Sequence, residues 1–241
     1  TCTTPAPKSR AIKKVLLYDT QDNEGILSNL NDSQTETVFV FRNLTGGMYN
    51  TLCLPFDVND LTGTPLENAT IWQYNGATVK GDGASKEIFL EFDNVTSIAA
   101  GEPYLVEPTE DIKAPMDFKN VTISVTNGSE IAAHTAVTMY GILHPTELQA
   151  NNKSILFLVE NNNLAWANET ANMNGMRAYF QLTEAEESRP MQVSARISVD
   201  RGSTTEDIIV LLPTDSQETA TKIMRNGIIY ILRNGEIYTL Q

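Results

Sequence analysis

The feature that most constrains the fold is a recurrence of short runs rich in β-branched and aromatic residues, with turn-forming residues between them. Thr37 to Phe41 and Tyr49 to Val58 are two such runs, and Asn75-Gly76 and Asn127-Gly128 are two of the turn signals. Across the 241 residues, no window carries an apolar stripe at helical spacing over three turns. The pattern predicts an all-β chain, built as an antiparallel β-sandwich of the jelly-roll or immunoglobulin-like type.

The segment from Tyr49 to Val58 has the clearest strand pattern in the chain. Its side chains alternate with a period of two, which is typical of a strand that is buried on one face. Pro55 has no backbone N–H to donate, and this places the far end of the strand at a sheet edge or at an exit from the sheet. The expected core face carries Leu52, Leu54 and Phe56, and the expected opposite face carries Tyr49, Thr51 and Cys53.

The other expected elements follow the same signals, and three domain ranges result. We expect a flexible lead over residues 1–11, a β-sandwich over 12–204 and a C-terminal tail over 205–241. In the tail, two Asn-Gly pairs flank an apolar run and predict a β-hairpin, with a third short strand before it. The hairpin strands are Ile228 to Leu232 and Glu236 to Leu240, and the remaining strands are Val15 to Tyr18, Ala69 to Tyr74, Glu87 to Phe92, Pro103 to Glu107, Val121 to Thr126, Ala136 to Leu143, Ser154 to Glu160, Met176 to Leu182 and Met191 to Val199.

Two local features sit between these strands. Residues 19–32 are expected to form a polar loop in which Ile26, Leu27 and Leu30 pack against the core. The pattern Phe-x-Asn-x-Thr occurs three times, at 41–45, 92–96 and 118–122. Because the intervals between the copies are unequal, the pattern indicates a reused local turn and not a repeat architecture.

The net charge disfavours some classes of partner, and the two cysteines leave two alternatives for the disulfide state. The net charge of −13 disfavours nucleic acid and anionic membrane surfaces, because both would repel the chain. No apolar run approaches the roughly 20 residues of a membrane span. A disulfide between Cys2 and Cys53 is one alternative, and the favoured one is a reduced Cys53 that acts as a small buried hydrophobic residue.

No recognisable catalytic, cofactor-binding or metal-binding constellation occurs in the sequence. There is no Gly-x-Ser-x-Gly motif, no phosphate-binding glycine loop and no zinc-ligand spacing. His134 and His144 lack a sequence-identifiable partner and are interpreted as structural. Residues 19–25 are rich in oxygen ligands but lack the acid spacing of an EF-hand loop. We therefore expect no enzyme activity and no cofactor.

Aromatic and amide side chains are the remaining groups in the sequence that could form a ligand-binding site. Trp72 and Tyr74 share a strand face, and Asn163 and Trp166 lie in an asparagine-rich region. Stacked rings beside amide groups are what carbohydrate binding requires, so these four residues are the candidate ligand-binding set. In the alternative interpretation, the two tryptophans cover the ends of the core.

Several motifs together resemble a family of secreted and surface proteins of gut Bacteroidetes. These are Tyr49-Asn50-Thr51-Leu52-Cys53-Leu54-Pro55-Phe56, Gly101-Glu102-Pro103-Tyr104-Leu105-Val106, Tyr140-Gly141 with Leu143-His144-Pro145, Arg177-Ala178-Tyr179-Phe180, and the tail from Ala220 to Leu240. The resemblance implies an exported, non-enzymatic β-module at the cell surface or outside the cell. A tyrosine at position 49, where the family commonly has tryptophan, departs from the pattern.

The expected function is therefore adhesion, glycan binding or surface assembly, with a glycan or a surface protein as partner. One alternative is a carbohydrate-active enzyme or accessory fragment, which predicts two facing carboxylates in a cleft, one of them with a raised pKa. The other is a surface-filament subunit, in which the tail hairpin or an open sheet edge donates a strand to a neighbour.

Overall fold

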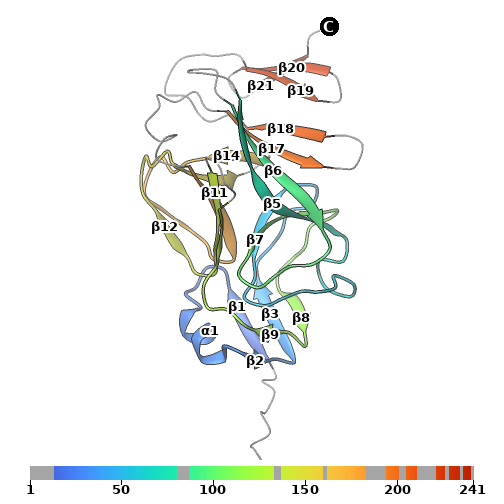
Figure 1. Ribbon diagram of the computed structural model, residues 1–241, viewed down its shortest axis with the longest axis vertical. Helices are drawn as coiled ribbons and strands as arrows, with labels where there is room; N and C mark the ends of the chain where they lie inside the picture. Colours follow the sequence, from blue (N-terminus) through green and yellow to red (C-terminus); the bar gives the residue numbers. More distant parts are fainter. Residues whose placement is uncertain are drawn as a thin grey trace, which may run out of the picture.

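A computed structural model describes residues 14–80, 87–132, 137–159 and 162–182, together with the backbone of five further strands (Figure 1). These strands are β17 (Ser194–Asp200), β18 (Thr205–Val210), β19 (Thr221–Arg225), β20 (Ile228–Arg233) and β21 (Glu236–Thr239). The expected lead over 1–11, Cys2 and His134 lie outside the described residues.

The described chain is built from strands, with a single short helix, and the all-β prediction is confirmed. A six-stranded sheet has the order β18-β17-β6-β5-β7-β4, and a five-stranded sheet has the order β10-β11-β16-β13-β14. The strands of the first sheet not yet introduced are β4 (Asn50–Cys53), β5 (Ala69–Lys80), β6 (Glu87–Val95) and β7 (Pro103–Pro108). Those of the second are β10 (Glu130–Ala132), β11 (Val137–Ile142), β13 (Ile155–Val159), β14 (Asn163–Ala165) and β16 (Arg177–Leu182).

A third, three-stranded sheet of order β1-β3-β8 lies at the end of the molecule that also carries the helix (Figure 1). Its strands are β1 (Val15–Tyr18), β3 (Thr37–Phe41) and β8 (Met116–Lys119). Two short pairs complete the main body: β2 (Ser33–Gln34) with β9 (Thr122–Ile123), and β12 (Thr146–Leu148) with β15 (Ala171–Met173). Most neighbours are antiparallel, but β1 with β3 and β17 with β6 are parallel. The jelly-roll or immunoglobulin-like assignment stays a prediction.

Two apolar cores hold these sheets together, one on each face of the β5-β7-β4 region. Along β7, Tyr104 and Val106 belong to the core shared with the three-stranded sheet, while Leu105 belongs to the core shared with the five-stranded sheet. Successive side chains of β7 therefore pack into two different cores, because other sheets cover both faces of this strand.

This arrangement corrects the interpretation of the segment from Tyr49 to Val58. Leu52, Leu54 and Phe56 lie in the first core as expected, and β4 is the edge strand of its sheet. However, Tyr49 and Thr51 are buried as well, so the prediction of a strand buried on one face is wrong. Period-two alternation shows that a strand has two faces, but it does not show what covers the second one.

Residues 19–32 contain a helix, α1 (Glu24–Leu30), where the sequence predicted a loop. Two helical turns are too short to display an apolar period. Asn23 anchors the helix to β1, because its side-chain oxygen accepts the Tyr18 N–H at 3.3 Å and its amide donates to the Tyr18 carbonyl at 2.9 Å. Leu27 is buried as expected, whereas Ile26 is 41% exposed and does not pack into the core.

Asn75-Gly76, expected as a turn, lies inside the long strand β5. The register against β6 shifts between Tyr74 and Gly76, and Gly76 has a φ of 140°. The pair therefore forms a β-bulge and lets the strand continue to Lys80. The tail hairpin of β20 and β21 is confirmed, as is a third strand, β19, beside it. The structure places β18 next to β17 in the six-stranded sheet, so this sheet extends past residue 204.

Cys53 is a free, buried thiol, in agreement with the favoured interpretation. Its Sγ donates to the Gly101 carbonyl at 3.2 Å. Burial raises the pKa of the thiol to about 12, and the nearby Arg42 guanidinium lowers it by less. Because only the thiolate reacts, we expect Cys53 to resist an aromatic disulfide reagent at pH 8 in the folded protein and to react once the chain is unfolded in urea. Rapid labelling of the folded chain at residue 53, located by peptide mass spectrometry, would contradict this prediction.

Candidate functional site

The structure corrects the expected ring platform. Trp72, Tyr74 and Trp166 are only 2%, 3% and 6% exposed, and all three belong to the core between the six-stranded and five-stranded sheets. The Tyr74 hydroxyl donates to the Val137 carbonyl at 2.9 Å, so it too is used inside the fold. The side chain of Asn163 is not among those described. The prediction that these rings stack on a sugar at the surface is wrong, and the alternative that the tryptophans are core residues is confirmed.

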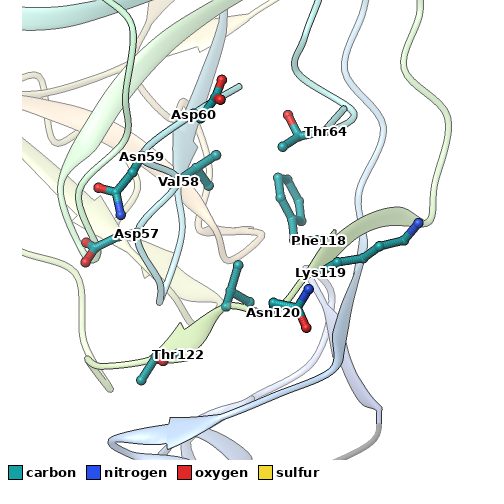
Figure 2. A pocket seen from close by; sticks show the side chains of 10 residues that line it. Asp57, Val58, Asn59, Asp60, Thr64, Phe118, Lys119, Asn120 and Thr122 are labelled. Carbon is teal, nitrogen blue, oxygen red and sulfur yellow. The ribbon is translucent and has the colours of Figure 1, made fainter. Parts of the chain in front are cut away.

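Polar side chains instead line a surface hollow beside the first core, which is the core shared with the three-stranded sheet (Figure 2). It lies between the loop over residues 57–64 and the corner that joins β8 to β9, and its volume is about 280 Å³. Its lining combines a small apolar floor with amide, hydroxyl and carboxylate groups. The lining residues are Asp57, Val58, Asn59, Asp60, Thr64, Phe118, Lys119, Asn120, Val121 and Thr122.

Backbone bonds hold the 57–64 wall of the hollow in place. Val58 and Ile98 exchange two backbone hydrogen bonds of 2.8 and 2.9 Å. The Asp57 carboxylate accepts the Ala100 N–H at 2.7 Å, and the Asp60 carboxylate accepts the Thr62 N–H at 2.9 Å. Both carboxylates therefore use one oxygen to fix the loop.

Backbone hydrogen bonds also hold the β8–β9 wall in place. Asn120 adopts the left-handed conformation, with a φ of 54°, and its N–H donates to the Glu36 carbonyl at 3.0 Å. Asparagine tolerates this conformation better than most residues. The Ser124 N–H donates to the Pro55 carbonyl at 3.0 Å and ties this wall to the end of the Tyr49–Val58 segment. Both walls are thus preformed.

The groups that remain available to a ligand are amides and hydroxyls. Asn59, Asn120 and Thr122 are exposed, and their side chains make no hydrogen bond to the described residues. The buried side chains of Val58 and Phe118 form the floor beneath them. The Lys119 side chain extends away from the hollow (Figure 2). Such a surface can bind hydroxyl groups through the amides while an apolar face of the ligand rests on the floor.

Electrostatics in the hollow do not favour acid–base catalysis. The pKa of Asp60 is lowered, mainly by the hydrogen bond from the Thr62 backbone N–H, and a general acid needs the opposite shift. Within the described residues, no three His, Cys, Asp or Glu side chains gather closely enough to bind a metal ion.

Sequence reasoning missed these residues, although one signal was present. The third copy of the Phe-x-Asn-x-Thr pattern, at 118–122, supplies the floor ring, the left-handed Asn120 and the Thr122 hydroxyl. The pattern indicated a turn but did not indicate that the 57–64 loop faces it. The two walls come from segments about 60 residues apart in the sequence, and only the tertiary contacts between these segments create the hollow.

Searches found no protein-family model, no curated protein and no solved structure that matches the chain. The resemblance to Bacteroidetes surface proteins therefore stays a prediction. Of the helical structure in the described ranges, none has the length and apolar character needed to cross a membrane.

Proposed function

We propose that this chain is a non-enzymatic, exported β-module that binds a neutral sugar unit in the hollow between the 57–64 loop and the β8–β9 corner. The observation that supports the proposal is that three exposed side chains, Asn59, Asn120 and Thr122, line one hollow together with the apolar Val58 and Phe118. Export and a place at the cell surface rest on the motif resemblance alone.

The volume of the hollow and the charge of its rim restrict the kinds of ligand that it can bind. Pockets for drug-sized ligands typically occupy about 300–1,000 Å³, and the hollow, with about 280 Å³, lies just below that range. It therefore suits one sugar ring at the end or along the side of a glycan. Asp57 and Asp60 make the rim acidic, and the chain carries a net charge of −13, so a neutral sugar is favoured over a sulfated or sialylated one.

The carbohydrate-active enzyme alternative gains no support from the hollow. Retaining and inverting glycosidases both require one carboxyl group that stays protonated near neutral pH. Asp60 is fully exposed with a lowered pKa, which keeps it ionised. A binding role uses the ionised carboxylate directly, as a hydrogen-bond acceptor for sugar hydroxyls.

Removing two of the hollow's polar groups is the sharpest test. We expect the double variant Asn59→Ala, Thr122→Ala to bind its sugar about 30-fold more weakly, because two hydrogen bonds of about 1 kcal/mol each are lost. A glycan array with the full chain identifies the sugar, and calorimetric titration with that sugar measures the loss. Asn172→Ala, an exposed asparagine on β15, is the matched control and should bind as the unmodified chain does. Binding of an array sugar with unchanged affinity in the double variant would exclude the hollow as its site.

A further inference from the structure

The apolar floor of the hollow is small, and this limits how a sugar can rest on it. Phe118 is the one aromatic residue among the lining residues, and it is only 1% exposed. Val58 is buried as well, and the two side chains point from the two walls toward the space between them (Figure 2). Stacking of a whole sugar ring needs an exposed aromatic face, which this floor does not offer. The floor therefore suits an apolar group about the size of a methyl group.

The wall beside this floor carries an acceptor with spare capacity. One oxygen of Asp57, Oδ1, accepts the Ala100 N–H at 2.7 Å, and the carboxylate makes no other hydrogen bond to the described residues. Asp57 is exposed, so its second oxygen is open to a ligand. A carboxylate only accepts hydrogen bonds, so the ligand must present an N–H or an O–H group here.

Amide groups face the same space from both walls. Asn59 lies on the 57–64 loop and Asn120 at the β8–β9 corner, and each amide can donate as well as accept a hydrogen bond. The Lys119 side chain extends away from the hollow (Figure 2), so amides and not an ammonium group supply the donors there. The hollow thus offers a neutral donor for a carbonyl oxygen of the ligand.

We propose that the hollow selects a sugar that carries an acetamido group, an N-acetylhexosamine; this inference rests on the proposed function. An acetamido group holds a methyl group, an N–H and a carbonyl oxygen in one rigid plane. The methyl group rests on Val58 and Phe118, the N–H donates to Asp57, and the carbonyl accepts from an asparagine amide. Each of the three groups therefore meets a partner of the kind that it requires.

Other classes of sugar match the hollow less fully. A hydroxyl group of a plain hexose can donate to Asp57, but no methyl group then covers the floor. A 6-deoxyhexose has a methyl group but no carbonyl oxygen next to it. A free amino sugar places an ammonium group against Asp57 and Asp60, yet leaves the floor and the amide donors unused. Sugars that differ at a single substituent therefore distinguish these classes.

Calorimetric titration of the full chain with simple glycosides tests the inference. The probes are methyl β-D-glucoside and methyl N-acetyl-β-D-glucosaminide, together with the corresponding galactose pair. The members of each pair differ only in the substituent at C2. In at least one pair, we expect the N-acetyl sugar to bind at least about tenfold more tightly, because it buries a methyl group and donates to an ionised acceptor.

Asp57→Asn should reduce this preference to about threefold or less. The asparagine oxygen can still accept the Ala100 N–H, while its amide nitrogen places a donor where the ligand needs an acceptor. Asp117→Asn is the matched control, because Asp117 is exposed on β8, is not a lining residue and loses the same charge. The control should keep the full preference, and circular dichroism confirms that both variants are folded.

Several results would overturn the inference and leave the proposed function standing. A hexose that binds as tightly as its N-acetyl counterpart is one of them, and tighter binding of methyl α-L-fucoside or of glucosamine is another. A preference that Asp57→Asn leaves unchanged is a third. If none of these probes binds and no glycan on the array binds either, the proposed function fails together with the inference.

Discussion

Gly128→Ala is expected to destabilise the protein by about 3 kcal/mol or more, since overpacking against rigid neighbours reaches or exceeds this value. A Cβ at residue 128 would lie 2.0 Å from the carbonyl oxygen of Gly141 and 2.3 Å from its carbonyl carbon. Both atoms belong to the backbone of β11, so no side-chain rotation can relieve the overlap. Urea unfolding followed by tryptophan fluorescence measures the change.

The surroundings of this contact explain why the backbone cannot yield. The Gly141 N–H donates to the Ser129 carbonyl at 2.8 Å, and the Ser129 N–H donates to the Gly101 carbonyl at 2.8 Å. Gly141 is crowded by β4 as well, because a Cβ at residue 141 would lie 2.8 Å from the Cys53 Sγ. Three segments and the edge strand β4 thus meet here at backbone distance.

Gly25→Ala is the matched control for this substitution. Gly25 lies in α1, and no atom lies within 4 Å of where its Cβ would be. Alanine favours the helix over glycine, so this variant should gain up to about 1 kcal/mol. If both glycine variants changed stability by the same small amount, the close contact at Gly128 would be refuted.

Arg42→Ala is expected to destabilise the fold by about 3–5 kcal/mol, the range typical for breaking a buried charged network. Arg42 is only 2% exposed, and its guanidinium donates to the carbonyls of Thr51 and Met176. These two carbonyls lie on β4 and just before β16, so one side chain joins the edge of the six-stranded sheet to the five-stranded sheet. Alanine would remove the guanidinium donor from both buried carbonyls, leaving the Met176 carbonyl with only the Cys53 N–H at 3.3 Å, and would open a cavity.

The charge of Arg42 is itself unfavourable in this position. Burial, and then repulsion from Arg177, lower the pKa of Arg42 below its ordinary value, while Asp19 acts in the opposite direction. Its contribution therefore comes from the forked hydrogen bonds and not from the charge. Arg42→Lys tests this distinction, because it keeps the charge but cannot span both carbonyls with a planar fork. We expect the lysine variant to recover less than half of the lost stability in urea titration; full recovery would show that charge alone suffices.

Sequence reasoning identified most of the strands but could not show which of them meet. Thr37 to Phe41 and Arg177 to Leu182 were predicted within two residues of their observed limits, because β-branched and aromatic side chains mark them. Short strands such as β12, β14 and β15 were missed, since three residues carry too little pattern. Helix α1 was missed for the same reason.

Candidate functional residues were predicted less well than strands. Trp72 and Trp166 were candidates for sugar stacking because exposure cannot be determined from residue type, and the structure buries both. Asn59 and Asn120 come from segments far apart in the sequence, and only folding brings their side chains to one hollow.

By itself, the sequence determined the all-β class, the presence of a strand within the segment Tyr49 to Val58 and the tail hairpin, and it favoured a buried, reduced Cys53. These properties depend on local alternation, turn chemistry and side-chain polarity, which act over a few residues. Only the tertiary structure decided that other sheets cover both faces of the β5-β7-β4 region, that Arg42 joins two sheets, and that a polar hollow remains at the surface. Each of these depends on contacts between distant segments, and no local pattern encodes which segments become neighbours.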